Sequence, residues 1–214
     1  MFQNFLTIEQ TREMFLYVAR GIVANEELLT DADKAIGDGD HGVGMTRGFR
    51  AVQEKLDGRT FENIHELLET IGITLLTTIG GAAGAIFGTF FRGGARCLDQ
   101  KDKFDTSVLI DFLGNGLDAV KDRGKAEMGD KTMVDALEPA FQEAQERVSN
   151  PLPEVLLAVA ESAKAGMEST KEFVAKTGKA KTLGERSIGF PDPGAVSIYL
   201  IMKFMTEYVL CNEK

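Results

Sequence analysis

Residues 30–49 read T-D-A-D-K-A-I-G-D-G-D-H-G-V-G-M-T-R-G-F and hold four aspartates within ten residues. These are Asp31, Asp33, Asp38 and Asp40, and His41 follows them. Carboxylates this close repel one another, so a folded site keeps them together only with a cation among them. Carboxylate oxygens, without cysteines or a histidine cluster, suit Mg²⁺ or Ca²⁺ better than Zn²⁺. The stretch therefore predicts a site for a hard divalent metal.

Four glycines lie between and after these aspartates, at positions 37, 39, 42 and 44. Glycine lets the backbone bend tightly and leaves its N–H groups open to an anion. A helix is predicted from near Gly42 to Gly58, with Phe49, Val52 and Leu56 on its apolar face. Its N-terminus would direct N–H groups and partial positive charge at whatever the aspartates hold. Metal-bound phosphate is therefore the first hypothesis for the ligand.

Other interpretations of this stretch differ in how well they fit. G-D-G-D-H-G at 37–42 matches the G-x-G-x-x-G of dinucleotide-binding loops, but no strand precedes it and two aspartates lie inside it. An EF-hand loop starting at Asp31 has alanine and isoleucine where Asp or Asn and then Gly are needed, and a start at Asp38 fails as well. A solvated acidic turn between helices stays open as the simplest alternative.

The composition limits the class of protein. A length of 214 residues fits a single domain over 1–214. The net charge of −9 argues against nucleic acid and anionic membranes as partners, and a phosphate ligand would need cations to offset it. Cys97 and Cys211 are isolated, which predicts free thiols in a reducing compartment, and two histidines are too few for a histidine-rich metal site. Glu9 and Arg12 interrupt the apolar N-terminus, so we expect no signal peptide and a cytoplasmic location.

Hydrophobic periodicity predicts an all-α protein of about eight helices, whose loops could meet at one end of a bundle. Thr7-x-x-Gln10 is a capping-box pattern, and the helix after it is expected to lead to the aspartates. Further helices are predicted over 64–75, 108–124, 133–149, 152–174 and 196–209. Residues 178–194 are predicted to be irregular, and no sustained strand alternation is present.

Residues 71–91 carry no charge, and 21 residues are long enough for a membrane span. A Gly-x-x-x-Gly repeat within them even matches a helix-dimer motif. Five glycines and four threonines dilute the hydrophobicity, however, and the flanks have no basic bias. We therefore expect two soluble helices, one ending near Ile79, then a Gly-Gly break, and a second starting at Ala82 or Ala83. Such a break would let a phosphate approach closely.

Five motifs together, in this order, resemble the nucleotide-binding L subunit of dihydroxyacetone kinases. They are G-D-G-D-H-G at 37–42, G-G-A-A-G-A-I-F-G-T-F-F at 80–91, R-G-K-A-E-M-G-D-K-T-M at 123–133, G-E-R-S-I-G at 184–189 and D-P-G at 192–194. The resemblance extends over essentially the whole chain. It implies an eight-helix antiparallel barrel, closed at one end by loops that hold ADP or ATP through two Mg²⁺ ions.

The resemblance also implies roles for individual residues, none of them catalytic. The implied metal ligands are Asp33, Asp38 and Asp40, with Asp31 outside the matched set. The implied nucleotide contacts are His41, Gly42, Val43 and Gly44 at a helix start, Ala82 and Ala83 at the phosphates, Gly88, Gly124 and Met133 at the adenine, Lys179, and Asp192, Pro193 and Gly194 closing the pocket.

Two positions depart from the family pattern. Ala83 stands where relatives often carry serine, so only a backbone N–H remains to contact a phosphate there. Lys179 stands where an arginine is common, which keeps the charge but removes a planar, bidentate contact.

By the same resemblance, the chain is half an enzyme. A histidine on a separate K subunit holds the substrate, dihydroxyacetone or a related ketose such as erythrulose. In one branch of the family an M-type phosphoryl-carrier subunit recharges bound ADP from phosphoenolpyruvate, and in the other ATP is exchanged from solution. A free-standing L chain favours the first branch. Such subunits also contact transcription regulators, so a non-catalytic nucleotide- or metal-binding regulatory module is the alternative, and a homodimer is left open.

Overall fold

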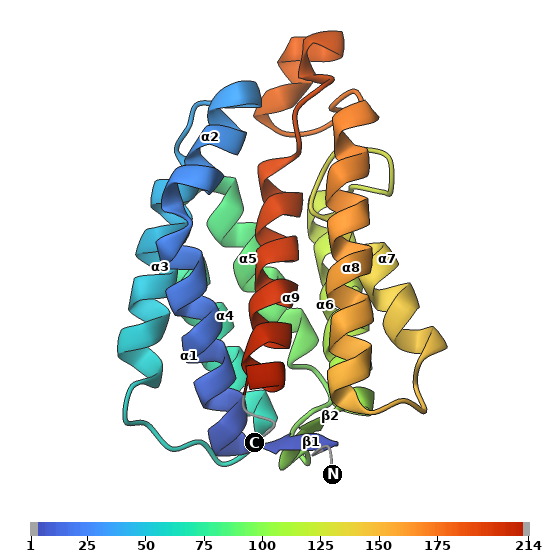
Figure 1. Ribbon diagram of the computed structural model, residues 1–214. Coiled ribbons are helices and arrows are strands. Elements are labelled where there is room, and N and C mark those ends of the chain that lie inside the picture. Colours follow the sequence, from blue (N-terminus) through green and yellow to red (C-terminus); the bar gives the residue numbers. More distant parts are fainter. Residues whose placement is uncertain (1–3, 212–214) are drawn as a thin grey trace.

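The protein is a barrel of helices with one short sheet, seen here in a computed structural model that describes residues 4–211 (Figure 1). The helices are α1 (Ile8–Ala24), α2 (Glu26–Ile36), α3 (His41–Leu56), α4 (Ile64–Thr78), α5 (Gly81–Gly94), α6 (Thr106–Gly124), α7 (Val134–Glu146), α8 (Leu152–Ser169) and α9 (Pro193–Cys211). The strands are β1 (Phe5–Thr7) and β2 (Lys103–Asp105), and two 3₁₀ helices are η1 (Thr170–Glu172) and η2 (Lys179–Ser187).

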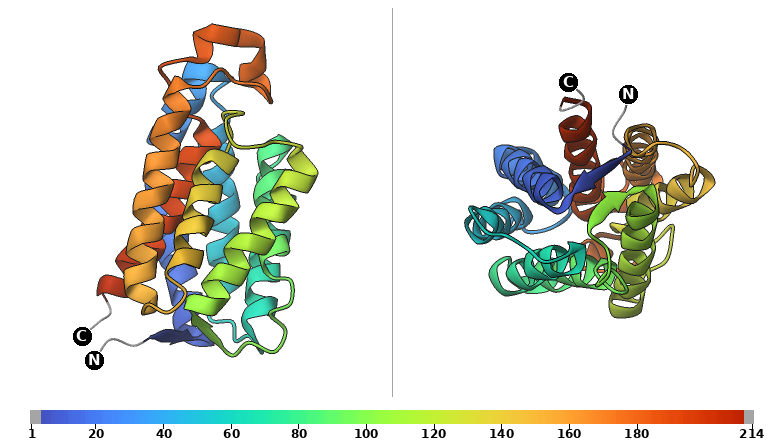
Figure 2. Two further views of the ribbon diagram at one scale, coloured as in Figure 1. Left: turned by 90° about the vertical axis from the view of Figure 1, so that its right-hand side faces the viewer. Right: turned by 90° about the horizontal axis from the view of Figure 1, so that it is seen from below.

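Eight of these helices close a ring. In the order α1, α3, α4, α5, α6, α7, α8, α9, each packs on the next, and α9 packs back on α1. Neighbours run in alternating directions, and the ring is visible when the molecule is seen along its axis (Figure 2). The predicted all-α class and eight-helix antiparallel barrel are confirmed. That one domain fills 1–214 stays a prediction, because residues 1–3 and 212–214 lie outside the described part.

The ninth helix, α2, is absent from the predictions. The helix begun by the capping box ends at Ala24, and the chain turns at Asn25, whose side chain donates to the carbonyl of Gly21 at 2.7 Å. A new helix then carries Asp31 and Asp33. The prediction that the first helix leads directly to an aspartate loop is therefore wrong, since two of the four aspartates lie on a helix of their own.

Other boundaries also differ from expectation. The helix predicted to reach Val174 ends at Ser169, because the hydroxyl of Thr170 donates to the carbonyl of Met167 and accepts from the backbone N–H of Asp192. Helix α7 ends at Glu146, before the Asn-Pro pair. The irregular residues 178–194 contain the 3₁₀ helix η2. Residues 171–189, called the roof segment from here on, cross the top of the barrel as the darker orange stretch above α8 and α9 in Figure 1.

The uncharged residues 71–91 form two antiparallel helices rather than one. Helix α4 ends at Thr78 and α5 begins at Gly81. Each boundary lies within two residues of the position predicted from the glycine pair. Gly80 and Gly81 have φ of 81° and 57°, a left-handed backbone that favours glycine. Among the described residues only α9 is long and apolar enough to cross a membrane, and 61% of that window is buried inside the bundle, as in a core helix.

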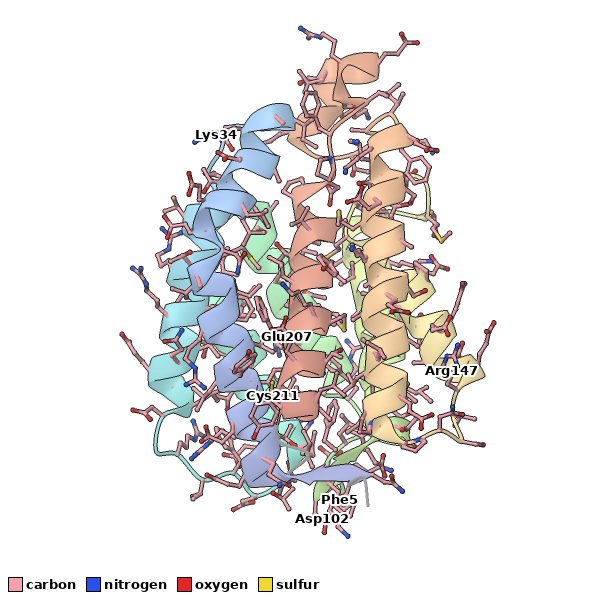
Figure 3. All side chains as sticks on the ribbon, viewed as in Figure 1. Phe5, Lys34, Asp102, Arg147, Glu207 and Cys211 are labelled. Atoms are coloured by element: carbon pink, nitrogen blue, oxygen red, sulfur yellow. The ribbon has the colours of Figure 1, made fainter. Side chains whose placement is uncertain are left out.

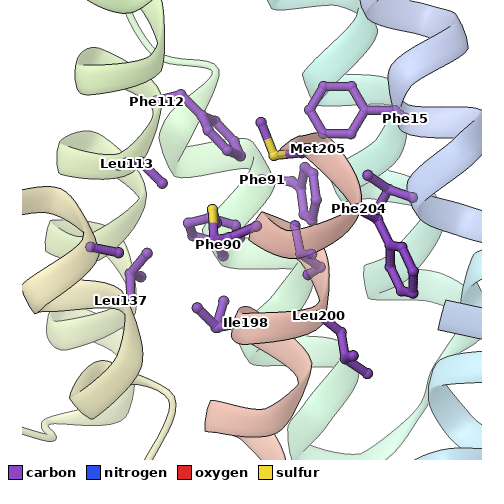
Figure 4. Packing of buried hydrophobic residues seen from close by; sticks show 14 of the residues in the cluster. Phe15, Phe90, Phe91, Phe112, Leu113, Leu137, Ile198, Leu200, Phe204 and Met205 are labelled. Atoms are coloured by element: carbon purple, nitrogen blue, oxygen red, sulfur yellow. The ribbon is translucent and has the colours of Figure 1, made fainter. Parts of the chain in front are cut away.

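The end of the barrel opposite the roof segment is closed by the two-stranded antiparallel sheet, in which Leu6 pairs with Phe104. Strands of three residues are too short for an alternating pattern, which is why the sequence did not predict them. The closed end is the lower half of the barrel in Figure 1. There Phe15, Phe91 and Phe112 stack edge to face or tilted around Met205 (Figure 4). Charged side chains such as Lys34 and Asp102 project outward at the two ends (Figure 3).

Candidate functional site

A cavity of about 700 Å³ opens at the end of the barrel beneath the roof segment. Four connections surround it: α2 to α3, α4 to α5, α6 to α7, and the roof segment to α9. Because neighbouring helices are antiparallel, these connections all come to the same end of the ring. Side chains far apart in the sequence, such as Asp33 and Asp192, therefore line one space.

The three predicted metal ligands meet at the edge of this cavity. One carboxylate oxygen from each of Asp33, Asp38 and Asp40 lies within 4.8 Å of the others. Asp33 is buried at the end of α2 and accepts the backbone N–H of His41 at 3.1 Å, while Asp38 and Asp40 are exposed. Between them Gly39 has φ of 76°, a left-handed backbone that favours glycine. An all-oxygen set at this spacing fits Mg²⁺.

Lys179 of the roof segment contacts the same acidic cluster. Its Nζ lies 2.5 Å from Asp38 Oδ2 and 3.2 Å from Asp40 Oδ2. The hydrogen bond from Lys179, helped by its charge, lowers the pKa of Asp38, and that same hydrogen bond raises the pKa of Lys179. The sequence predicted Lys179 as a nucleotide contact, and its direct pairing with two of the predicted metal ligands is an additional finding.

His41 opens α3 and is held inside the barrel. Its Nε2 lies 2.8 Å from the hydroxyl of Ser197 on α9, and that hydroxyl donates to the carbonyl of Pro193. The serine oxygen is then left to accept, so the imidazole carries its proton on Nε2. Burial lowers the pKa of His41, although Asp33 and Asp40 oppose this. His41 therefore connects α3 to α9 as a neutral ring, with its backbone N–H on Asp33.

Two helix N-termini face the cavity without a side-chain cap. These are α3, preceded by Asp40, and α5, preceded by Gly80. In α3 the N–H of His41 is already taken by Asp33, so the later first-turn N–H groups there, and those of α5, are a ready site for an anion. Arg47 adds a positive charge beside α5, where its guanidinium donates to the carbonyls of Thr78 (2.6 Å) and Ile79 at the end of α4.

The opposite wall comes from the α6–α7 connection and the start of α9. Asp192 accepts the N–H of Ala195 at 2.8 Å and so caps α9, while burial raises the pKa of this carboxyl to about 7. Met133 lies next to Gly194, and Lys131 stands beside them in the cavity lining. Ile86 and Phe87 of α5 add an apolar surface to the cavity, where the ring of Phe87 lies 6.1 Å from that of His41.

Thirteen of the sixteen predicted site residues line the cavity, and three glycines do not. Gly42 packs against the backbone of α2 near Glu26, and Gly88 lies against Gly72 and Leu76 where α5 meets α4. Gly124 ends α6, where an added Cβ would lie 3.6 Å from Ile86, itself a cavity residue. The roles of all sixteen residues as ligand contacts stay predictions.

The cavity also contains residues that the predictions omitted, among them Arg47, Lys131, Thr132 and Thr177. The signal was available for three of them. Arg47 belongs to residues 30–49, and Lys131 and Thr132 belong to the motif at 123–133. In a chain of net charge −9, a cation inside a glycine-rich motif is a candidate partner for an anion. Thr177 carried no such signal.

An all-α barrel with clustered carboxylates, cations and helix N-termini around one cavity has the features expected of a domain that binds an anion through a divalent metal. The chain belongs to the DAK2 domain family, whose model matches residues 35–207. The predicted relation to the L subunits of dihydroxyacetone kinases is thereby confirmed.

Individual relatives agree with this assignment. The chain is 40% identical to the ADP-binding subunit DhaL of the PEP-dependent dihydroxyacetone kinase of Escherichia coli, over 84% of this chain and 86% of that one. It is 35% identical to the DhaL of the PTS-dependent enzyme of Lactococcus lactis, over 95% and 99%. It is 32% identical to the L-erythrulose 1-kinase of Mycolicibacterium smegmatis, over 95% of this chain and 38% of that longer one.

Solved structures show the same fold. The dihydroxyacetone kinase of C. freundii in its native form superposes with a TM-score of 0.74 at 28% identity, covering 97% of this chain and 35% of that one. The same enzyme in complex with AMP-PNP and Mg²⁺ gives 0.74 at 26% identity, with the same coverage. This chain thus spans about a third of the C. freundii enzyme.

Proposed function

We propose that this protein is the ADP-binding subunit of a dihydroxyacetone kinase. It would relay a phosphoryl group, through Mg-bound nucleotide, to dihydroxyacetone or a related ketose held on a separate K-type subunit. One observation carries the proposal: three carboxylates within 4.8 Å of one another stand in the same cavity as two uncapped helix N-termini. The first group suits a divalent metal and the second suits the phosphates that the metal would bind.

Each part of the cavity has a task in this proposal. Asp33, Asp38 and Asp40 would hold Mg²⁺, two ions in all, and the metal would neutralise charge on the phosphate oxygens. Lys179 and Arg47 would offset the remaining negative charge. Phosphoryl transfer depends on positioning and charge neutralisation more than on covalent chemistry from the protein, so this chain needs no nucleophile.

The size and lining of the cavity support an adenine nucleotide. A volume of about 700 Å³ is in the range of sites for ligands of this size. The apolar surface formed by Ile86, Phe87 and Met133 would take the base. Gly124, at the end of α6, lies next to Ile86. The phosphates would then extend toward Ala82, Ala83 and the acidic cluster.

The second substrate would come from a partner. His41 is the histidine in this cavity, and its ring is buried and bonded to Ser197, so it is not free to hold a ketose. Exposed apolar side chains surround the cavity end: Val43 (51%), Met128 (54%), Ile188 (45%) and Phe190 (43%). Apolar groups gathered at one end of an acidic protein favour a docking surface for the K-type subunit.

The phosphoryl source is proposed to be phosphoenolpyruvate, delivered by an M-type carrier subunit that recharges bound ADP. The supporting observation is that the relatives matched over most of their own length are named as subunits of PEP- or PTS-dependent enzymes. In the longer L-erythrulose 1-kinase and the human triokinase/FMN cyclase, the matched region is 38% and 33% of the whole.

Binding of MgADP tests the site, with Asp38→Asn as the variant and Asp31→Asn as its matched control. Both aspartates belong to the same stretch, but Asp31 lies outside the cluster and pairs with Lys34 at 3.4 Å. Asp38→Asn should weaken MgADP binding by about 100-fold or more, equivalent to about 3 kcal/mol, in isothermal titration. Asp31→Asn should change the dissociation constant by less than about twofold.

Reconstitution tests the reaction. With K-type and M-type partners and phosphoenolpyruvate, the chain should support phosphorylation of dihydroxyacetone, and alone it should not. Purified protein should also retain ADP, seen by intact mass and ultraviolet absorbance. Kinase activity of the lone chain would contradict the division into subunits. Binding of MgADP without any transfer in the complete mixture would favour the regulatory module.

A further inference from the structure

Lys131 is a buried cation in the cavity wall that the reaction described above does not use. The residue is 2% exposed and has φ of 62°, a left-handed backbone that non-glycine residues rarely adopt. Among the described residues no ion pair joins it to a carboxylate, and burial lowers its pKa, although the charges of Asp192 and Asp135 oppose this. Burying an ammonium without a carboxylate is costly, so its hydrogen-bond partners identify what the group does.

Those partners lie at the two ends of the roof segment. The ammonium donates to the carbonyl of Thr170 and, at 2.6 Å, to the carbonyl of Phe190. Between them runs the roof segment, residues 171–189, and its ends also meet directly, since the N–H of Gly189 donates to the carbonyl of Lys171 at 2.7 Å. One side chain thus holds both ends of a closed loop.

The roof segment has few other attachments to the barrel. The N–H and ammonium of Lys176 contact Asp130 at 3.2 and 3.0 Å, next to Lys131 in the chain. At the other side of the cavity Lys179 contacts Asp38 and Asp40. The position of Lys179 therefore depends on how firmly the base of the loop is held.

The turn that carries Lys131 is itself fixed by α7. One oxygen of the buried Asp135 accepts the N–H of Gly129 at 2.5 Å, and the other accepts the N–H of Thr132 at 2.7 Å. This carboxylate therefore holds the backbone on both sides of Lys131. Hydrogen bonds run without interruption from α7, through Lys131, to the base of the roof segment.

We propose that Lys131 is a positioning residue that fixes the roof segment at both ends and thereby sets Lys179 against the acidic cluster. The inference rests on the proposed function only in that Lys179 serves nucleotide binding. Lys131 acts through the loop and not through the phosphates.

Hydrogen exchange without nucleotide tests the anchoring step. Lys131→Met should speed amide exchange in the roof segment by about tenfold or more, while exchange in α6 stays unchanged. Lys125→Met is the matched control, because Lys125 is in the same connection, also has a left-handed backbone (φ 51°) and is exposed. It should leave the roof segment as in the wild type. Unchanged exchange in Lys131→Met would overturn the proposal.

Lys131→Gly replaces Lys131→Met in this experiment if the methionine variant does not fold, because glycine adopts the left-handed backbone without a steric cost. It also lacks the ammonium, so the roof segment should again exchange about tenfold faster. A folded Lys131→Gly with wild-type exchange in residues 171–189 would equally overturn the proposal.

A double-mutant cycle with Lys179→Met separates positioning from direct contact. Lys131→Met should weaken MgADP binding by about tenfold, and the double variant should bind no more weakly than the weaker single variant. Losses that multiply would show that Lys131 contacts the nucleotide itself and would overturn the inference. If the wild type does not bind MgADP, the proposed function fails, and the exchange experiment still decides the role of Lys131.

Discussion

The two ends of the barrel differ in what they bury. Within the described residues, the ionisable residues with almost no exposed area are Asp33, His41, Lys131 and Asp135. All four lie at the cavity end, as does the desolvated carboxyl of the half-buried Asp192. The closed end is filled by aromatic rings around Phe15 and finished by the short sheet. Burying polar and charged groups costs stability, whereas burying apolar groups provides it. The closed end therefore stabilises a barrel whose other end is arranged for binding.

The largest effect is expected from removing an aromatic ring at the closed end. Phe112 is fully buried and its ring contacts Phe15, Phe90 and Phe91. Phe112→Ala should lower the free energy of unfolding by about 3–5 kcal/mol in urea denaturation, because it leaves a cavity. Phe190→Ala, at the cavity end and 43% exposed, should cost less than about 1 kcal/mol. Equal losses would remove the distinction between the two ends.

The pH dependence of stability should also differ between the ends. Burial raises the pKa of Asp192 to about 7, so the folded protein binds this proton more tightly than the unfolded chain does. Stability should therefore fall as pH rises from about 4 to about 7, by at most about 1.4 kcal/mol per pH unit. Asp192→Asn should lack this component when the two proteins are compared by thermal denaturation across that range without nucleotide.

A carboxyl near the closed end should behave in the opposite way. The N–H of Glu62 lowers the pKa of Glu66 at the start of α4, with help from Arg59. Its contribution should be present above the unfolded pKa and be lost as pH falls through the lowered value. Glu66→Gln should thus differ from the wild type mainly at acidic pH. An Asp192→Asn profile parallel to that of the wild type would contradict the contrast.

The smallest effect is expected at the first helix cap. Thr7 and Gln10 form a reciprocal capping box before α1, with distances of 3.2 and 2.9 Å. Thr7→Ala should lower the free energy of unfolding by about 1 kcal/mol, because an N–H at the helix start loses its partner. Thr77→Ala, in the last turn of α4, is the control and should cost nothing measurable, since alanine favours helix. If Thr77→Ala lowered the free energy of unfolding more than Thr7→Ala, the loss of the helix cap would not explain the effect.

Local signals explain what could be predicted of the fold. The capping box at Thr7 and the glycine pair at 80–81 each act within a few residues, and the helices begin and end at them. The turn at Asn25 depends on a bond to Gly21 and on packing of α2 against α3 and α9, which no short pattern contains. The pairing of β1 with β2 joins residues a hundred positions apart, and their register is set by the barrel.

The parts of the candidate site that come from one short motif could be predicted, because residues such as Asp38 and Asp40 are close in space when they are close in the sequence. The site was not predictable where a glycine could serve either a sharp turn beside the ligand or the close packing of two helices. Gly80 allows a backbone reversal beside the cavity, but Gly42 and Gly88 allow close approach of two helices, and sequence alone does not separate these roles. Nor does it show that Lys131 reaches the carbonyls of Thr170 and Phe190, which are 39 and 59 residues away in the chain.

Both described ends of the chain, β1 and the last turn of α9, lie at the closed end, far from the cavity opening (Figure 1). In-line joining to another polypeptide at either end would leave the entrance clear, which fits the presence of this domain inside longer relatives. Cys211 offers an exposed thiol on that side. Protein tethered there to a sensor surface would face solution with its ligand entrance, ready for the nucleotide and partner measurements.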